Sequence, residues 1–197
     1  RQFRPVLTMR QVSASFHDAP YLDNKVAIAF LSTDEVEKHY DDAQTRLTSL
    51  SRFIGFLVAG TAGYQCKSNM LAFPSLAEAV EFGLRLMEAL HQSDAKLIEG
   101  APVAPRFLRY GCKCGTYDTM GAHPSTGRAD YYGRVVNRAA RIAGASELGT
   151  VCCGFTESED ANLSHFGVEA TPLGVRRLKG VKEDMRMFLC TNAVLTK

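Results

Sequence analysis

The chain has 197 residues, enough for one large domain, and its 46% hydrophobic and 22% charged residues are typical of a globular protein. The formal net charge is only +2, so the overall charge does not indicate a nucleic-acid partner. No apolar run approaches the roughly 20 residues that cross a bilayer, and no signal peptide is visible. We therefore expect a cytoplasmic domain without a membrane segment. Because the chain begins without Met, we expect it to be the cytosolic part of a longer protein, for example a membrane-bound one.

The first elements expected along the chain are an irregular lead-in, a buried strand and a long helix. Residues 1–24 are mixed and unpatterned, with two prolines and a turn signal at the end. The nearly continuous apolar run over residues 25–31 predicts a strand that is buried on both faces. A helix is expected from about Thr33, as the N-cap, to about Val58, because acidic residues follow Thr33 and Gly60 follows Val58.

A hairpin and a second helix come next. Residues 63–73 read as two short strands with a turn near Lys67 to Asn69. Ser75 and Glu78 form a capping-box pattern, and apolar residues then recur at helical spacing. The sequence therefore predicts a helix over residues 75–91.

The second half of the chain predicts more strands around one further helix. Residues 106–115 read as a strand, residues 116–128 as a polar loop, and residues 133–146 as a helix that begins at a Gly. Strands are expected at 150–153, 167–170, 174–178 and 185–190, with a short helix at 158–163. This order suits an α+β ferredoxin-like sandwich, with a βαββαβ core and extra C-terminal strands, better than a doubly wound parallel sheet. We expect one domain over residues 25–197.

The six cysteines, at positions 66, 112, 114, 152, 153 and 190, match neither a Cys-x-x-Cys pattern nor a zinc-finger spacing. Cys112 and Cys114 alternate with Lys113, which sends both sulfurs to one face of a strand. Reduced thiols packed in a core are the preferred interpretation, and a metal or redox site is the alternative.

The segment over residues 130–142 places Asn137 and Arg141 four residues apart, and therefore on one face of the expected helix. On spacing alone such a pair is more often a solvated surface than a catalytic pair. Arg134, Arg138 and Arg141 also form a basic stripe of the kind that can contact nucleic acid. No aromatic residues or further basic runs are interleaved with it, so we expect no nucleic-acid partner.

Four motifs together resemble the catalytic domain of class III nucleotidyl cyclases, most closely those of fungal and protist adenylyl cyclases. They are Arg109-Tyr-Gly-Cys-Lys-Cys-Gly115, Asp130-Tyr-Tyr-Gly-Arg-Val-Val-Asn-Arg-Ala-Ala-Arg-Ile142, Arg177-Leu-Lys-Gly180 and Met187-Phe-Leu189. The order of elements agrees over residues 25–191. The resemblance implies a homo- or heterodimer with its active site at the interface. It also implies Mg²⁺ or Mn²⁺, and attack of the ribose 3′-hydroxyl on the α-phosphate with release of pyrophosphate.

The resemblance assigns roles to five residues of this chain. Asn137 matches the amide that orients the ribose, and Arg141 matches the Arg that stabilises charge at the α-phosphate. Asp130 and Lys67 match the positions that recognise adenine. Lys179 matches the Lys that reaches the terminal phosphates, with Lys182 as a competitor for that role.

The carboxylates that hold the metals in this family are not in place. The family has an Asp two residues after the Phe of the first strand, where this chain has Ser32 after Phe30. The hairpin lacks the second Asp and carries Lys67-Ser68-Asn69 instead, while Asp34 lies two positions late for the first site. Either the domain has lost metal binding or the sequence lacks loop residues on both sides of the site. We assign no metal ligand.

Two functions follow from this divided match. The first is an adenylyl cyclase domain that converts ATP to cyclic AMP and pyrophosphate, supplies the base, ribose and phosphate contacts, and receives its metal carboxylates from a second cyclase domain. The second is a catalytically inactive cyclase-like domain that binds a nucleotide or regulates a partner.

Overall fold

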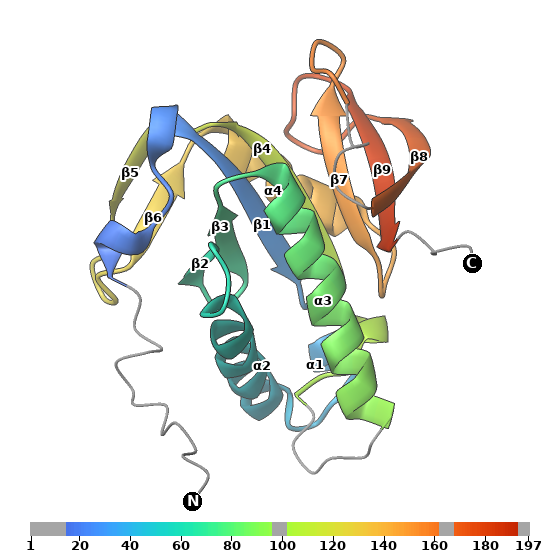
Figure 1. Cartoon of the computed structure of the whole chain (residues 1–197). Helices are drawn as coiled ribbons and strands as arrows, with labels where there is room; N and C mark the ends of the chain where they lie inside the picture. The colour runs from blue at the N-terminus through green and yellow to red at the C-terminus, as the bar shows by residue number, and fades with distance from the viewer. Residues whose placement is uncertain (1–14, 96–101, 162–167, 193–197) are drawn as a thin grey trace, which may run out of the picture.

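The computed structural model describes residues 15–95, 102–161 and 168–192, and a seven-stranded sheet forms its centre (Figure 1). The strands lie in the order β2-β3-β1-β4-β7-β9-β8, with β4 and β7 parallel and the other neighbouring pairs antiparallel. Their bounds are β1 Lys25–Ser32, β2 Tyr64–Lys67, β3 Met70–Phe73, β4 Arg109–Thr116, β7 Val151–Thr156, β8 Val168–Arg176 and β9 Met185–Asn192.

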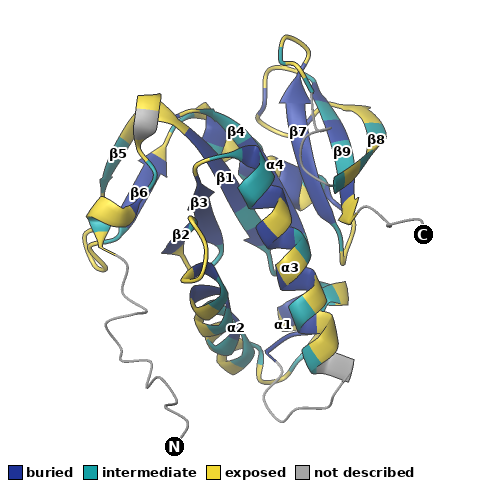
Figure 2. Cartoon of the chain, viewed as in Figure 1, coloured by how far each residue is buried: buried dark blue, intermediate teal, exposed yellow. Residues whose placement is uncertain are grey.

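Helices cover both faces of this sheet. The helices are α1 Val36–His39, α2 Ala43–Val58, α3 Leu76–Ala95 and α4 Arg134–Ala145. Strand β1 shows the two sides: Ala27 and Ala29 belong to a core cluster with residues of α2 and α3. Ile28 belongs to a second cluster with Val135 and Ala139 of α4. The predicted burial of this strand on both faces is therefore confirmed, and Figure 2 shows strands β1, β4 and β7 as largely buried.

The first six major elements form the predicted ferredoxin-like core. Along the chain they run β1, α2, β2, β3, α3 and β4, and in the sheet the strands lie as β2-β3-β1-β4. Helix α4 then crosses to the opposite face, and β7, β9 and β8 extend the sheet beyond β4. The α+β class and the extra C-terminal strands are confirmed.

A separate two-stranded ribbon consists of β5 Thr119–Ala122 and β6 Ala129–Tyr132. The prediction of a loop over residues 116–128 is therefore wrong, because β5 lies within this stretch and pairs with β6, which follows it. The ribbon is attached to the rest of the chain by side chains. The Tyr131 side chain is buried and its hydroxyl donates to the Pro20 carbonyl, while the Ala129 amide donates to the Tyr64 hydroxyl at 2.9 Å.

The predicted single helix over residues 33–58 is also wrong, because it is interrupted at Tyr40. Helix α1 ends at His39, and Tyr40 has an extended backbone with φ −133° and ψ 123°. The Tyr40 ring packs edge-on against Phe107, and its hydroxyl accepts a hydrogen bond of 3.2 Å from the Ala104 amide. These contacts with a distant segment override the helical preference of the local sequence.

Smaller differences lie around the other strands. Strand β4 begins at Arg109 because Pro105–Phe107 forms a 3₁₀ turn. Residues 167–170 and 174–178 were expected as two strands, but β8 runs continuously from Val168 to Arg176 with an irregularity between Pro172 and Gly174. Residues 158–161 form no helix, and the remainder of that predicted helix lies outside the described residues.

Two local predictions are confirmed in detail. Ser75 and Glu78 form the expected cap, since the Glu78 amide donates to Ser75 Oγ and this hydroxyl donates to Glu78 Oε2 at 2.7 Å. The six cysteines are free thiols, and all except the half-buried Cys114 are buried. None of the helices in the described ranges is long and apolar enough to span a membrane.

Candidate functional site

Two glycines fix the position of helix α4. Gly133 is its N-cap and has φ 138°, and a Cβ there would lie 2.8 Å from the Asp118 amide nitrogen. A Cβ at Gly111 of β4 would lie 2.1 Å from the Ala143 nitrogen, so the helix packs directly on the strand backbone. Neither position accommodates a side chain without movement of the backbone. The helix that carries the predicted catalytic pair is therefore held closely against the sheet.

The predicted pair lies on the exposed side of this helix. Val135, Ala139 and Ile142 are buried toward the sheet, whereas Asn137 and Arg141 are exposed. Among the described residues, no hydrogen bond or ion pair is formed by either side chain of the pair. Both side chains are thus available to a ligand or a partner domain.

Lys67 and Asp130 come together from two different sheets. Lys67 is the last residue of β2, Asp130 lies on β6, and Lys67 Nζ is 2.8 Å from Asp130 Oδ2. The Tyr132 hydroxyl donates to the same oxygen at 3.1 Å. The Asp130 side chain is only 4% exposed, against 44% for Lys67. The other carboxylate oxygen, Oδ1, is buried and has no hydrogen-bond partner within the described ranges. A buried acceptor without a donor is costly and marks this carboxylate as a candidate ligand contact.

The loop between β8 and β9 brings Lys182 rather than Lys179 next to helix α4. Lys182 lines a hollow of about 220 Å³ together with Asn137 and Arg134. Lys179 is exposed and is not among the residues that line it. The loop is anchored by the buried side chains of Leu178 and Val181, which pack in a cluster with Ile142 of α4. Of the two lysines named from the sequence, Lys182 is therefore the one that lies beside Asn137.

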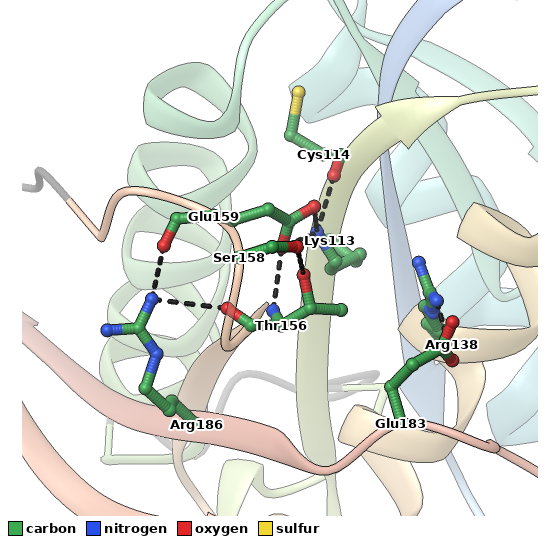
Figure 3. A network of polar contacts seen from close by, with 8 residues as sticks. All are labelled: Lys113, Cys114, Arg138, Thr156, Ser158, Glu159, Glu183 and Arg186. Atoms are coloured by element: carbon green, nitrogen blue, oxygen red, sulfur yellow. Dashed lines mark hydrogen bonds and ion pairs between the residues drawn. The ribbon is translucent and has the colours of Figure 1, made fainter.

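An ion pair fastens the same loop to the helix. Arg138 Nη2 lies 2.7 Å from Glu183 Oε2, and the Arg138 side chain is 15% exposed (Figure 3). The hydrogen bond from Arg138 lowers the pKa of the Glu183 carboxyl, which therefore stays ionised. The sequence showed Arg138 only as part of a basic stripe, and its partner was not predicted.

A second polar network, also not predicted, lies beside this pair. Lys113 of β4 is almost completely buried, and its Nζ donates at 2.7 Å to both carboxylate oxygens of Glu159 and to the Cys114 carbonyl (Figure 3). Glu159 also accepts from the Thr156 amide at 2.7 Å, and Arg186 donates to the Thr156 and Glu159 carbonyls. Burial alone would raise the pKa of Glu159, but the hydrogen bonds from Lys113 and Thr156 outweigh it and the pKa is lowered. The sequence feature that could have indicated this network is Lys113 itself, a lysine within an otherwise apolar strand.

Comparison with known families decides the identity of the domain. The family described as adenylate and guanylate cyclase catalytic domain matches residues 58–192, more than half of the chain. The chain belongs to this family. It is a cyclase catalytic domain of the adenylyl or guanylyl type, as the four sequence motifs and the fold indicate.

Solved cyclase structures share the fold of this domain. An adenylate cyclase from Trypanosoma brucei, described in its monomeric state, superimposes with a TM-score of 0.65 at 19% identity, covering 90% of this chain and 92% of that one. The adenylyl cyclase CyaB from P. aeruginosa gives 0.64 at 17% identity, covering 87% and 95%. The guanylate cyclase domain of RhGC from Catenaria anguillulae, solved in complex with GTP, gives 0.65 at 18% identity, covering 85% and 96%. A comparison with curated proteins gave no significant match.

The metal ions that cyclases of this family use do not fit the residues of this chain. The expected positions are Ser32, at the end of β1, and the β2–β3 turn. A groove of about 550 Å³, which includes Thr33 and the turn residues Ser68 and Asn69, is lined by hydroxyls, amides, apolar groups and Arg52. No carboxylate is among its lining residues. Ser32 Oγ donates a hydrogen bond of 3.0 Å to Asp34 Oδ2, and Asp34 does not line the groove. No group of three or more His, Cys, Asp or Glu that could hold a metal occurs within the described parts of the chain. Mg²⁺ and Mn²⁺ prefer oxygen ligands that include carboxylates, and the described residues that line this groove offer none.

Proposed function

We propose that this chain supplies the base, ribose and phosphate contacts of an adenylyl cyclase whose active site lies at a dimer interface. The reaction is the conversion of ATP to 3′,5′-cyclic AMP and pyrophosphate. The observation that carries the proposal is the Lys67–Asp130 pair, with its unsatisfied buried oxygen, on the same domain as the exposed Asn137 and Arg141.

The choice of ATP over GTP rests on the acceptor character of Asp130. Adenine presents a 6-amino donor, whereas guanine presents an O6 acceptor at the same edge. A donor from the base can satisfy Oδ1 of Asp130, and a second acceptor placed there would repel it. Lys67, which is partly exposed, can donate to a ring nitrogen. Because Oδ1 is covered in this structure, neighbouring side chains have to shift when a base enters.

Helix α4 and the β8–β9 loop supply the remaining contacts. The Asn137 amide orients the ribose, and the Arg141 guanidinium stabilises the charge that develops on the α-phosphate. Lys179 was the first candidate for the terminal phosphates, and the hollow beside Asn137 supports Lys182 in that role. A lysine ammonium beside Asn137 can bind the terminal phosphates as a point charge.

The partner in this proposal is a second cyclase domain that carries the metal carboxylates. Two copies of this chain would both present the carboxylate-free groove, so the composition of the groove favours a heterodimer over a homodimer. In that arrangement the partner's carboxylates would hold the divalent metals, which would supply positive charge near the reacting groups, while this chain binds and orients the nucleotide.

The same groove also supports the alternative of a cyclase-like domain that binds nucleotide without turnover. The full chain should be assayed with ATP and Mn²⁺, first alone and then mixed with a candidate partner domain that has the two carboxylates. Cyclic AMP formed only in the mixture, and lost with Arg141→Ala in this chain, is the expected result. Nucleotide binding without cyclic AMP in any mixture would favour the inactive alternative, and absence of binding would contradict both.

A further inference from the structure

Helix α4 and the loop before β9 line a cationic hollow, and one ion pair joins the helix to the loop there. The hollow of about 220 Å³ is lined by Arg134, Asn137, Arg138 and residues 180–183. Three of these side chains are cationic (Arg134, Arg138 and Lys182), and one, Glu183, is anionic. The net positive charge of this enclosed space suits a polyanion.

The cationic side chains that line the hollow differ in their contacts. Arg138 is mostly buried and is bound to Glu183 at 2.7 Å. Arg134 and Lys182 are exposed, and no short contact to a carboxylate is formed by either within the described residues. The pair therefore neutralises one cation and leaves two available. Arg134 is also in the first turn of α4, where the helix dipole favours an anion.

Only a few contacts connect the loop to the helix at this point. Leu178 and Val181 are buried against Ile142, but Gly180 between them has φ 75° and lies exposed. The ion pair between Glu183 and Arg138 is the charged contact between the loop and the helix. Lys182 directly precedes Glu183 and lies on the side of α4 that carries Asn137. Without this contact, nothing polar in the described part of the loop would hold Lys182 near that face.

We propose that Arg138 and Glu183 are positioning residues, whose ion pair holds Lys182 beside helix α4 so that Arg134 and Lys182 contact the polyphosphate of the nucleotide next to the ribose-orienting Asn137. This inference rests on the proposed function and adds three residues to it. Arg134 becomes a contact for the phosphates that the sequence motifs did not indicate. Arg138 and Glu183 act through Lys182 and do not touch the substrate.

The Glu183→Gln variant separates positioning from simple electrostatics. It removes a negative charge from the rim of the hollow, so a purely electrostatic model predicts tighter binding of an anion. The positioning model predicts weaker binding, because the neutral amide holds the loop less firmly. We expect about tenfold weaker binding of inorganic tripolyphosphate and of ATP by the full chain, measured by calorimetry.

Two further variants and one control complete the test. The exchange Arg138→Glu with Glu183→Arg keeps the total charge and restores the pair, so affinity should return most of the way to the starting value. Glu81→Gln removes an equivalent carboxylate from the Arg85–Glu81 pair on α3, which has a 2.6 Å contact but is exposed, and should leave binding unchanged. Thermal unfolding of each variant confirms that loss of binding does not reflect loss of the fold.

The outcomes distinguish this inference from the function on which it rests. Unchanged or tighter tripolyphosphate binding by Glu183→Gln would overturn the positioning role, while ATP binding by the parent chain would leave the proposed function intact. Tripolyphosphate binding without ATP binding would support the pocket and contradict the base contacts. No tripolyphosphate binding by the parent chain would overturn the pocket.

Discussion

Lys67 at the end of β2 reaches Asp130 on the separate β5–β6 ribbon, with 2.8 Å between Nζ and Oδ2. The ribbon and the main sheet thus meet through a charged contact at the proposed base position. Because Tyr132 also donates to Oδ2, the second oxygen of Asp130 is left as an unsatisfied acceptor. In the proposed function, a donor on the base completes this arrangement.

Exchange of both residues should change the preferred base. Lys67→Glu together with Asp130→Cys replaces the Asp130 acceptor by a thiol that can donate to guanine O6, and the Lys67 donor by a carboxylate that can accept from the guanine 2-amino group. We expect the ratio of ATP to GTP affinity to fall by about tenfold or more, since unpaired polar groups in a binding site are strongly discriminating. Competition between the two nucleotides for the full chain gives this ratio. An unchanged ratio in a variant that remains folded would contradict the assignment of the base contacts.

Arg141→Ala should remove activity while leaving the fold intact. The side chain is exposed on α4, so little packing is lost, but its charge at the α-phosphate is proposed to act in the transition state. We expect the turnover of the assembled enzyme to fall by about 10²–10³-fold with a smaller effect on nucleotide affinity. Arg85→Ala on the exposed side of α3 is the matched control. Similar turnover for both variants would exclude Arg141 from the reaction.

Glu159→Gln should destabilise the domain, because it leaves the buried Lys113 ammonium without its counter-charge. We expect a loss of about 2 kcal/mol, below the roughly 3–5 kcal/mol of fully buried pairs because Glu159 is partly exposed. Urea unfolding measures this difference. The exposed Glu81→Gln variant should change stability by less than about 0.5 kcal/mol. Equal effects of the two variants would show that burial of Lys113 has no energetic consequence.

The same carboxyl makes stability depend on pH in a defined direction. Its pKa is lowered from 4.5 in the folded chain, so it binds a proton more readily when unfolded. Its stabilising contribution is therefore complete above pH 4.5 and is lost as the pH falls through the lower folded value. Unfolding free energies measured between about pH 6 and pH 3 should fall more steeply for the parent chain than for Glu159→Gln. Parallel curves would show that another carboxyl is responsible.

Gly111→Ala should disturb helix α4 although the residue lies on β4. Its Cβ would approach the Ala143 nitrogen to 2.1 Å, so the helix has to move away from the strand. We expect a loss of about 3 kcal/mol. Gly144→Ala, on the same helix with no atom within 4 Å of the added Cβ, should be neutral or stabilising by about 0.5–1 kcal/mol. Chemical denaturation of the two variants provides the comparison, and similar stabilities would contradict the close packing.

The parts of the fold that were predictable are those fixed by local patterns. The Ser75–Glu78 cap, the buried β1 and the hairpin turn depend on residues close together in the sequence, and each was confirmed. The break at Tyr40 depends on contacts with Ala104 and Phe107, which no periodicity reveals. Strand β5 is short and partly exposed, so it lacks the apolar signal of a buried strand.

The candidate site was likewise predictable only in part. Spacing along α4 placed Asn137 and Arg141 on one exposed face, and the resemblance to cyclases named Lys67, Asp130 and Lys179. The partners of these residues were not predictable. Glu183 meets Arg138, and Glu159 meets Lys113, through the folding of loops whose course depends on the whole sheet.

The self-contained pairing of β5 with β6 has a consequence for engineering. The ribbon exchanges backbone ladder hydrogen bonds only between its own two strands, and Tyr131 and the Ala129 amide secure it to the body of the domain. A ribbon from another cyclase that keeps these two anchors can therefore be transplanted without changing the register of the seven-stranded sheet. Such an exchange would vary only one of the two proposed base contacts, because Asp130 lies on the ribbon whereas Lys67 stays on β2.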